Sequence, residues 1–145
     1  MTLEHWYGVN FEKHTWSHPW AAGPATHTVR RIFGVRPLTM GYRTVAIHPQ
    51  PPTNLSHGTM TLPTERGTIS VFFNRSKSHF ELQVSLPNNT RGHVCLPTAL
   101  LPPNSVLILD GSQADSSRPE KGQLCLVDMI VGGDTEHTIV AMVKL

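Results

Sequence analysis

The stretch TISVFFNRSKSHFELQVSL, residues 68–86, decides the fold of this chain. Apolar side chains occupy every second position on both sides of a short polar segment, Asn74–Ser78. A period of two is that of a β-strand with one buried face, because successive side chains point to opposite sides of a sheet. The polar segment is built of residues that favour turns. The stretch therefore predicts two antiparallel strands, Thr68–Asn74 and His79–Leu86, joined as a hairpin.

The same pattern continues in both directions from this hairpin. From residue 41 onward, short segments rich in Val, Ile, Thr and Phe are separated by Pro, Gly or Asn. A second hairpin is expected at the loop Pro63–Gly67, and a polar surface loop at Ser112–Gly122. Six further strands are expected, at Thr44–His48, His57–Leu62, Gly92–Leu96, Ser105–Leu109, Leu124–Val131 and Thr138–Val143. Short strands separated by turns predict a mainly β protein, an antiparallel β-sandwich of about eight strands.

One α-helix is expected before the strands, at roughly Trp20–Phe33. Pro24 is compatible only with the first turn of a helix, which fixes where the helix begins. Gly34 follows the last turn as the expected left-handed stop. One face of this segment is apolar at helical spacing, through Ala25, Val29, Ile32 and Phe33.

Composition and charge exclude several classes of function. The chain has 145 residues, 39% of them apolar, and a net charge of only +2 with the Lys and Arg residues spread out. A nucleic-acid partner is therefore not expected. The longest apolar runs are far shorter than the roughly 20 residues of a membrane span, so no membrane partner is expected either. The first ten residues lack the pattern of a signal peptide, and a cytoplasmic location follows if Met1 is the genuine N-terminus.

Cysteine and histidine residues are the remaining candidates for metal or redox chemistry. Cys95 and Cys125 are each flanked by apolar residues, and we expect buried free thiols, with their pairing left open. His14 and His18 stand four residues apart, the spacing of a metal-binding pair on one helix face. Pro19 biases His18 away from the helical region, and no third ligand is near in sequence. We expect no metal site and no cofactor.

Residues 16–49 carry several short motifs in an unusual order. The motifs are Ser17-His18-Pro19-Trp20 followed by Pro24, then Phe33-Gly34-Val35-Arg36-Pro37, Gly41-Tyr42-Arg43 and Ala46-Ile47-His48-Pro49. In this order they resemble the C-terminal part of the α-L-rhamnosidases of glycoside hydrolase family 78. Gly67–Val71 and Leu86–Pro97 also resemble strands of that family's β-sandwich. The resemblance covers nearly the whole chain.

This resemblance implies a division of the chain into two parts. Residues 1–36 would be the last piece of an (α/α)6 catalytic barrel, and residues 41–145 the C-terminal β-sandwich domain. The family hydrolyses terminal α-L-rhamnosyl residues with inversion, which requires two acidic residues. The resemblance implies that Glu4 is the general base and that His18 and Trp20 contact the sugar. Leu3 departs from the family's motif before the base, and the family's general acid has no counterpart in this chain.

Two interpretations of the whole chain stay open. The first is the C-terminal domain of a rhamnosidase-like glycosidase, inactive as this chain, whose partner is a rhamnosyl glycoside or another carbohydrate. It predicts self-association through residues 1–34, because a barrel helix without its neighbours exposes apolar surface. The second is a free-standing, non-catalytic β-sandwich module that binds carbohydrate or a protein partner. In that case Glu4 is a solvated carboxylate and His18 a hydrogen-bonded residue at a helix N-terminus.

Overall fold

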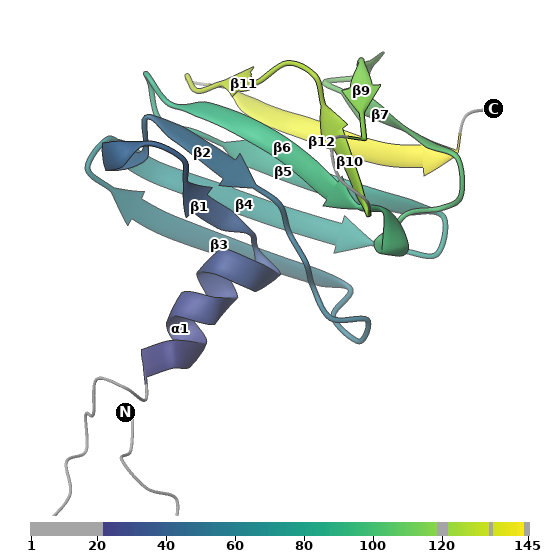
Figure 1. Cartoon of the computed structure of the whole chain (residues 1–145), viewed down its shortest axis with the longest axis horizontal. Helices are drawn as coiled ribbons and strands as arrows, with labels where there is room; N and C mark the ends of the chain where they lie inside the picture. Colours follow the sequence, from purple (N-terminus) through teal and green to yellow (C-terminus); the bar gives the residue numbers. More distant parts are fainter. Residues whose placement is uncertain (1–21, 119–121, 134, 144–145) are drawn as a thin grey trace, which may run out of the picture.

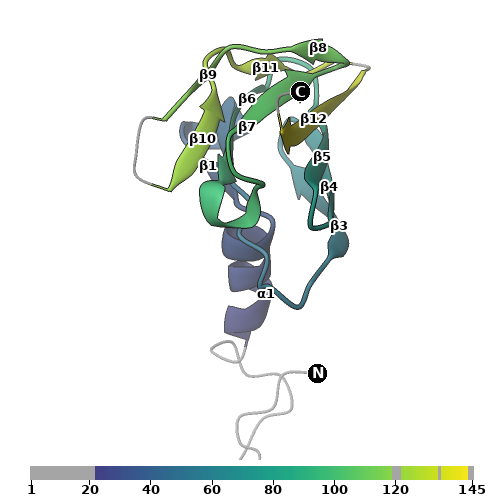
Figure 2. The same cartoon turned by 90° about the vertical axis from the view of Figure 1, so that its right-hand side faces the viewer.

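Two β-sheets stacked face to face make up most of the molecule, as Figure 1 and the edge-on view of Figure 2 show. The computed structural model describes residues 22–118, 122–133 and 135–143. The expected antiparallel β-sandwich with one helix near its N-terminus is confirmed. The described part of the chain contains no helix with the length and apolar character of a membrane span.

The first sheet, here called the hairpin sheet, is antiparallel throughout. Its strand order is β3-β4-β5-β12-β7-β8. The bounds are β3 His57–Thr64, β4 Gly67–Arg75, β5 His79–Ser85, β12 Glu136–Val143, β7 Ser105–Leu109 and β8 Ser112–Gln113. Both expected hairpins are present, since β3 leads directly into β4 and β4 into β5.

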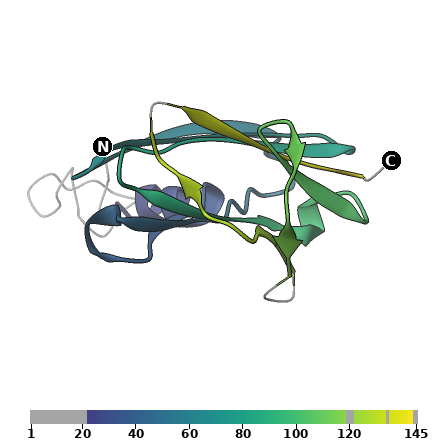
Figure 3. The same ribbon diagram turned by 90° about the horizontal axis from the view of Figure 1, so that it is seen from above.

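The second sheet, here called the mixed sheet, combines parallel and antiparallel pairs. Its order is β1-β2-β6-β10-β9, with β11 also paired to β6. The bounds are β1 Val35–Pro37, β2 Thr44–Ile47, β6 Arg91–Pro97, β10 Gln123–Leu126, β9 Ser116–Ser117 and β11 Ile130–Val131. Strand β2 runs parallel to β6, whereas the other pairs of this sheet are antiparallel. Seen from above, the two sheets lie as separate layers (Figure 3).

The core fills the space between these layers. From the hairpin sheet come Ile69, Val71 and Phe73 of β4 and Phe80, Leu82 and Val84 of β5, all fully buried. The mixed sheet contributes Val45, Ile47, Val94, Leu96, Leu124 and Leu126. The ring of Phe73 lies 5.4 Å from that of Phe33 and 6.2 Å from that of Phe80, centroid to centroid. Through these aromatic contacts, the segment after the helix packs against the β4–β5 hairpin, whose sequence pattern predicts the fold.

The expected helix is confirmed within the described residues. It consists of α1, Gly23–His27, which continues into the π-helical turn η2, Thr28–Ile32. Pro24 lies in its first turn, and Gly34 follows with a left-handed φ of 72°. A side chain at residue 34 would collide with the backbone of His48, so this stop requires glycine for space as well as for φ. The helix projects from one end of the sandwich beside β1 and β3 (Figure 1).

Two expected segments differ in detail. The strand expected at Leu124–Val131 is split into β10 and β11, because the pairing with β6 shifts by two residues between Cys125↔Cys95 and Ile130↔Gly92. The extra residues form a bulge at Val127–Met129. The expected surface loop Ser112–Gly122 contains two short edge strands, β8 and β9, whose residues are exposed. Two short 3-10 turns, Met40–Tyr42 and Thr98–Leu100, complete the described elements.

Candidate functional site

The three site residues expected from the sequence, Glu4, His18 and Trp20, lie outside the described residues. The same holds for His14. Their roles stay predictions. The described part of the chain contains two other groups of side chains that could bind a ligand or a metal ion: a basic cleft and a histidine–cysteine cluster.

The basic cleft lies at the ends of strands from both sheets, between the β3–β4 turn and the starts of β2 and β6. It has a volume of about 830 Å³. Most of its lining is polar, formed by Arg43, Thr44, Arg66, Asn88, Asn89, Thr90, Arg91, Val131 and Gly132. Arg66 stands in the turn between β3 and β4 of the hairpin sheet, Arg43 directly precedes β2, and Arg91 is the first residue of β6 in the mixed sheet. The cleft therefore depends on the packing of the two sheets.

Backbone contacts fix the three arginines at the rim. The Arg91 amide donates a hydrogen bond to the Arg43 carbonyl oxygen at 2.9 Å, which joins the residue before β2 to the start of β6. Arg66 Nε donates to the carbonyl oxygen of Gly41 at 2.8 Å. Within the described residues, no carboxylate forms an ion pair with any of the three guanidinium groups. Three guanidinium groups without an ion-pair partner among the described residues make this cleft attractive to an anion.

A buried hydroxyl belongs to one of the residues that line the same cleft. Thr90 is fully buried, and its Oγ1 has no hydrogen-bond partner among the described residues. Its backbone is fully engaged, because the amide donates to Pro87 O at 3.2 Å and the carbonyl accepts from the Gly132 amide at 2.8 Å. A buried polar atom without a partner is costly, so a ligand or water oxygen at this position would be stabilised. Arginine recognises carboxylate, phosphate and sulfate groups through paired N–H donors.

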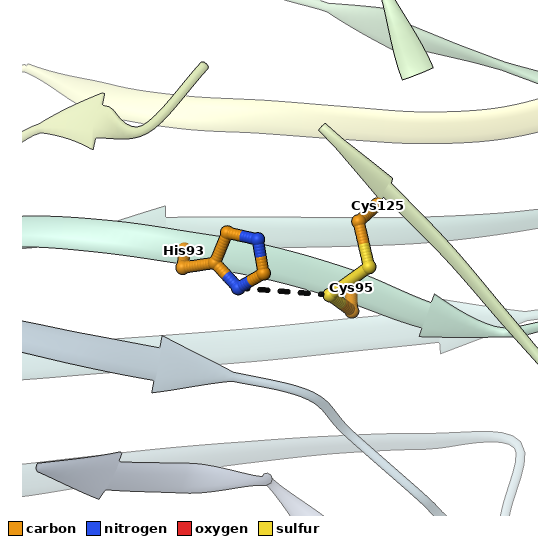
Figure 4. A group of neighbouring side chains, drawn as sticks. All are labelled: His93, Cys95 and Cys125. Atoms are coloured by element: carbon orange, nitrogen blue, oxygen red, sulfur yellow. Dashed lines mark hydrogen bonds between the residues drawn. A yellow bond between two sulfur atoms is a disulfide. The ribbon is translucent and has the colours of Figure 1, made fainter. Parts of the chain in front are cut away.

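The histidine–cysteine cluster lies on the mixed sheet. Cys95 of β6 and Cys125 of β10 are directly opposite each other and form a disulfide, with their Cα atoms 4.0 Å apart. The expectation of free thiols is therefore wrong, although the expected burial is correct, at 4% and 0% exposure. Two cysteines thirty positions apart give no local sign of pairing, and only the register of β6 and β10 brings them together. His93 lies two residues before Cys95 on the same face of β6, with Nδ1 3.8 Å from Cys95 Sγ (Figure 4).

One further polar pair stabilises the far end of the hairpin sheet. His137 Nδ1 lies 2.8 Å from Asp110 Oδ2, and His137 Nε2 lies 3.0 Å from the carbonyl oxygen of Val131. Burial lowers the pKa of His137, but the hydrogen bonds to Asp110 and Val131 and the charge of Asp110 outweigh it, so the pKa is raised. Burial raises the pKa of Asp110, and the contacts with His137 and the Thr138 amide reverse this, so its pKa is lowered. The pair is a structural tie between the turn after β7 and β12.

The fold defines the chain first as a β-sandwich domain preceded by a short helix. The narrower assignment comes from sequence: residues 34–104 match the family model of the bacterial α-L-rhamnosidase C-terminal domain. The chain thus resembles a C-terminal part of an α-L-rhamnosidase. The resemblance stated from the motifs of residues 16–49 is confirmed at the level of the family.

Individual relatives agree with this assignment. An α-L-rhamnosidase of Formosa agariphila is 32% identical over 68 residues, which are 47% of this chain and 7% of that protein. The α-L-rhamnosidase structure from Dictyoglumus thermophilum has a similar fold, with a TM-score of 0.75 at 18% identity over 89% of this chain and 14% of that one. The Streptomyces avermitilis α-L-rhamnosidase complexed with L-rhamnose gives a TM-score of 0.67 at 24% identity, over 89% of this chain and 12% of that one. This chain thus corresponds to a small fraction of each relative.

Neither described site is predicted by the sequence alone. The three cleft arginines are separated by more than twenty residues each, and only the alignment of β2 with β6 and the β3–β4 turn brings them together. His93 and Cys95 have the i, i+2 spacing that puts two side chains on one strand face, and this was the one available signal. The position of Cys125 depends on long-range strand pairing.

Proposed function

We propose that this chain is the C-terminal part of an enzyme that hydrolyses terminal α-L-rhamnosyl residues with inversion, and that the chain by itself is inactive. The observation that supports this proposal most strongly is the match of residues 34–104 to the rhamnosidase C-terminal domain. Residues 1–36 are assigned to the barrel and residues 41–145 to the β-sandwich domain.

Inversion sets a requirement that this chain alone does not meet. A general acid must protonate the leaving oxygen while a general base activates water on the opposite face of the sugar, with the two carboxyl groups about 6.5–9.5 Å apart. Glu4 is proposed as the base, and His18 and Trp20 as sugar contacts. The family's general acid has no match in this sequence, and general acid catalysis contributes about 10²–10⁴-fold to such rates.

The sugar contacts are testable by titration with L-rhamnose, observed by ligand-detected NMR. Wild-type chain is expected to show weak binding that His18→Ala and Trp20→Ala each reduce. His57→Ala is the matched control, because His57 is an exposed imidazole on β3 of the hairpin sheet. Equal binding by His18→Ala, Trp20→Ala and the wild type would remove His18 and Trp20 from the proposal.

The second candidate function, a free-standing module that binds carbohydrate without catalysis, is favoured by the basic cleft. Arg43, Arg66 and Arg91 suit a sugar that carries a carboxylate or sulfate group. Titration with galacturonate against neutral galactose tests this function, and binding of the acidic sugar that Arg91→Ala weakens would support it.

Size-exclusion chromatography over a concentration series separates the two candidates. An enzyme fragment is expected to self-associate through residues 1–34, and deletion of residues 1–13 should change that behaviour. A monomer at all concentrations that is unaffected by the deletion would favour the free-standing module.

A further inference from the structure

The histidine–cysteine cluster brings three metal-ligating atoms together on one face of the mixed sheet. His93 Nδ1, Cys95 Sγ and Cys125 Sγ all lie within 4.8 Å of one another. Figure 4 shows the imidazole lying along β6 with Nδ1 directed at the Cys95 sulfur, and Cys125 reaching the same point from β10. The three side chains therefore converge on one small region, independently of the basic cleft.

The spacing of these atoms suits a tetrahedral cation. Zinc binds thiolate sulfur at about 2.3 Å and imidazole nitrogen at about 2.0–2.1 Å, so two such ligands are about 3.5–3.8 Å apart. The distance of 3.8 Å between His93 Nδ1 and Cys95 Sγ is already close to this separation. Only the two sulfur atoms must move apart, and they can do so once the bond between them is broken.

Strand pairing keeps the ligands in place in the reduced state. The neighbouring pairs Leu96↔Leu124 and Pro97↔Gln123 continue the β6–β10 ladder, and both leucines are anchored in the core. On its other edge, β6 is held by four pairs with β2. The two cysteines therefore stay opposite each other without the disulfide, and a site whose ligands are already positioned loses little entropy on binding.

Burial and charge also favour a cation. Cys95 and Cys125 are 4% and 0% exposed, and two thiolates in such surroundings require neutralisation. A divalent ion balances both charges, with neutral His93 as the third ligand. Thiolate and imidazole together select zinc over magnesium or calcium, which require oxygen ligands.

We propose that reduction of the Cys95–Cys125 disulfide creates a zinc site formed by Cys95 Sγ, Cys125 Sγ and His93 Nδ1. In the reduction, a phosphine or dithiol donates two electrons, the S–S bond breaks, and each sulfur takes up a proton; the phosphine becomes its oxide with oxygen from water, or the dithiol becomes a disulfide. Zinc then displaces the two thiol protons, which leave to solvent. The oxidised and zinc-bound forms are mutually exclusive, because the same sulfur electron pairs serve both.

The test compares zinc binding by the oxidised and the phosphine-reduced full chain, each freed of reagent under anaerobic conditions. The reduced chain is expected to retain one more zinc ion per chain than the oxidised chain during competition with a chromogenic chelator. All nine histidines are present in both forms, so this difference isolates the cysteines. Cobalt should give thiolate charge-transfer absorption with the reduced chain alone.

Three variants assign the ligands. Cys125→Ser is expected to bind no additional zinc after treatment with reductant, and His93→Ala to bind zinc at least about tenfold more weakly in the reduced state. His57→Ala, an imidazole on the other sheet, should match the wild type. Equal zinc content of the oxidised and reduced wild-type chain would overturn the proposal, as would unchanged affinity in His93→Ala. If reduction unfolds the chain, one equivalent of zinc should restore its circular dichroism, and failure to restore it also overturns the proposal.

Discussion

His137 Nδ1 of β12 lies 2.8 Å from Oδ2 of Asp110, in the turn that follows β7. Asp110 has a left-handed φ of 50°, and its other carboxylate oxygen accepts a hydrogen bond from the Thr138 amide at 2.8 Å. One carboxylate thus secures both the turn and the start of the last strand. The contact joins residues far apart in sequence and adds side-chain bonds to the β7–β12 ladder.

This pair predicts a pH-dependent contribution to the free energy of unfolding. The raised pKa of His137 contributes stability that is fully present below the pKa of about 6.5 in the unfolded chain. This stability is lost as pH rises through the pKa of the folded state. The lowered pKa of Asp110 gives a second stabilising contribution. It is present above the unfolded pKa of 3.8 and is lost as pH falls through the pKa of the folded state. The pair therefore stabilises most between about pH 4 and 6.5. The magnitude is under about 1 kcal/mol, because the Asp110 side chain is 46% exposed.

Asp110→Asn isolates this charge effect, since asparagine also tolerates the left-handed turn. Urea unfolding at pH 5.5 should show a loss of up to about 1 kcal/mol relative to wild type, and a smaller loss at pH 8.5. Asp115→Asn, an exposed carboxylate elsewhere, is the control. A loss that is the same at both pH values would contradict the assigned ion pair.

Gly34→Ala is expected to be far more destabilising than Gly111→Ala. Both glycines have left-handed φ, 72° and 83°, so both variants incur about 1 kcal/mol of backbone strain. Only at residue 34 would the new methyl group collide with the His48 backbone, whereas nothing lies within 4 Å at residue 111. Urea unfolding of the two variants measures the difference, and equal losses would show that the helix stop is not held against His48.

Phe33→Ala should cost about 3–5 kcal/mol of stability. Phe33 is 6% exposed and contacts Phe73, the ring at the centre of the core. Leu38→Ala, at 53% exposure, should change the stability by no more than about 0.5 kcal/mol. Thermal and urea unfolding compare the two variants. A small effect of Phe33→Ala would mean that the segment after the helix does not depend on the sandwich.

The disulfide should contribute about 3–4 kcal/mol, because it closes a loop with a sequence separation of 30 residues. The double variant Cys95→Ala/Cys125→Ala is expected to lose this amount in urea unfolding. Wild-type chain treated with reductant and a metal chelator should lose a similar amount. Unchanged stability after verified reduction would indicate that the cross-link constrains the unfolded chain very little.

The sequence predicts those parts of the fold that depend on neighbouring residues. The hairpin Thr68–Leu86 is predicted because alternation and turn residues act locally, and the helix because Pro24 and Gly34 mark its ends. The parallel pairing of β2 with β6, the bulge at Val127–Met129 and the edge strands depend on contacts between distant segments. No local pattern encodes them.

The described sites follow the same rule. Arg43, Arg66 and Arg91 line one cleft only once the two sheets have packed together. The even spread of charged residues along the sequence therefore gives no sign of this basic surface. The burial of Cys95 and Cys125 was predictable from their apolar neighbours, whereas their bond depended on the register of two strands. The proposed roles of Glu4, His18 and Trp20 rest on the resemblance and stay predictions.

Hydrolysis of p-nitrophenyl α-L-rhamnoside by the purified chain tests the central claim most directly. The α-L-rhamnosidase of Streptomyces avermitilis serves as the positive control under the same conditions. A C-terminal part without the general acid should release no nitrophenolate above the buffer blank. Sustained turnover by this chain that Glu4→Gln abolishes would contradict the account, because it would mean that these 145 residues contain a complete catalytic site.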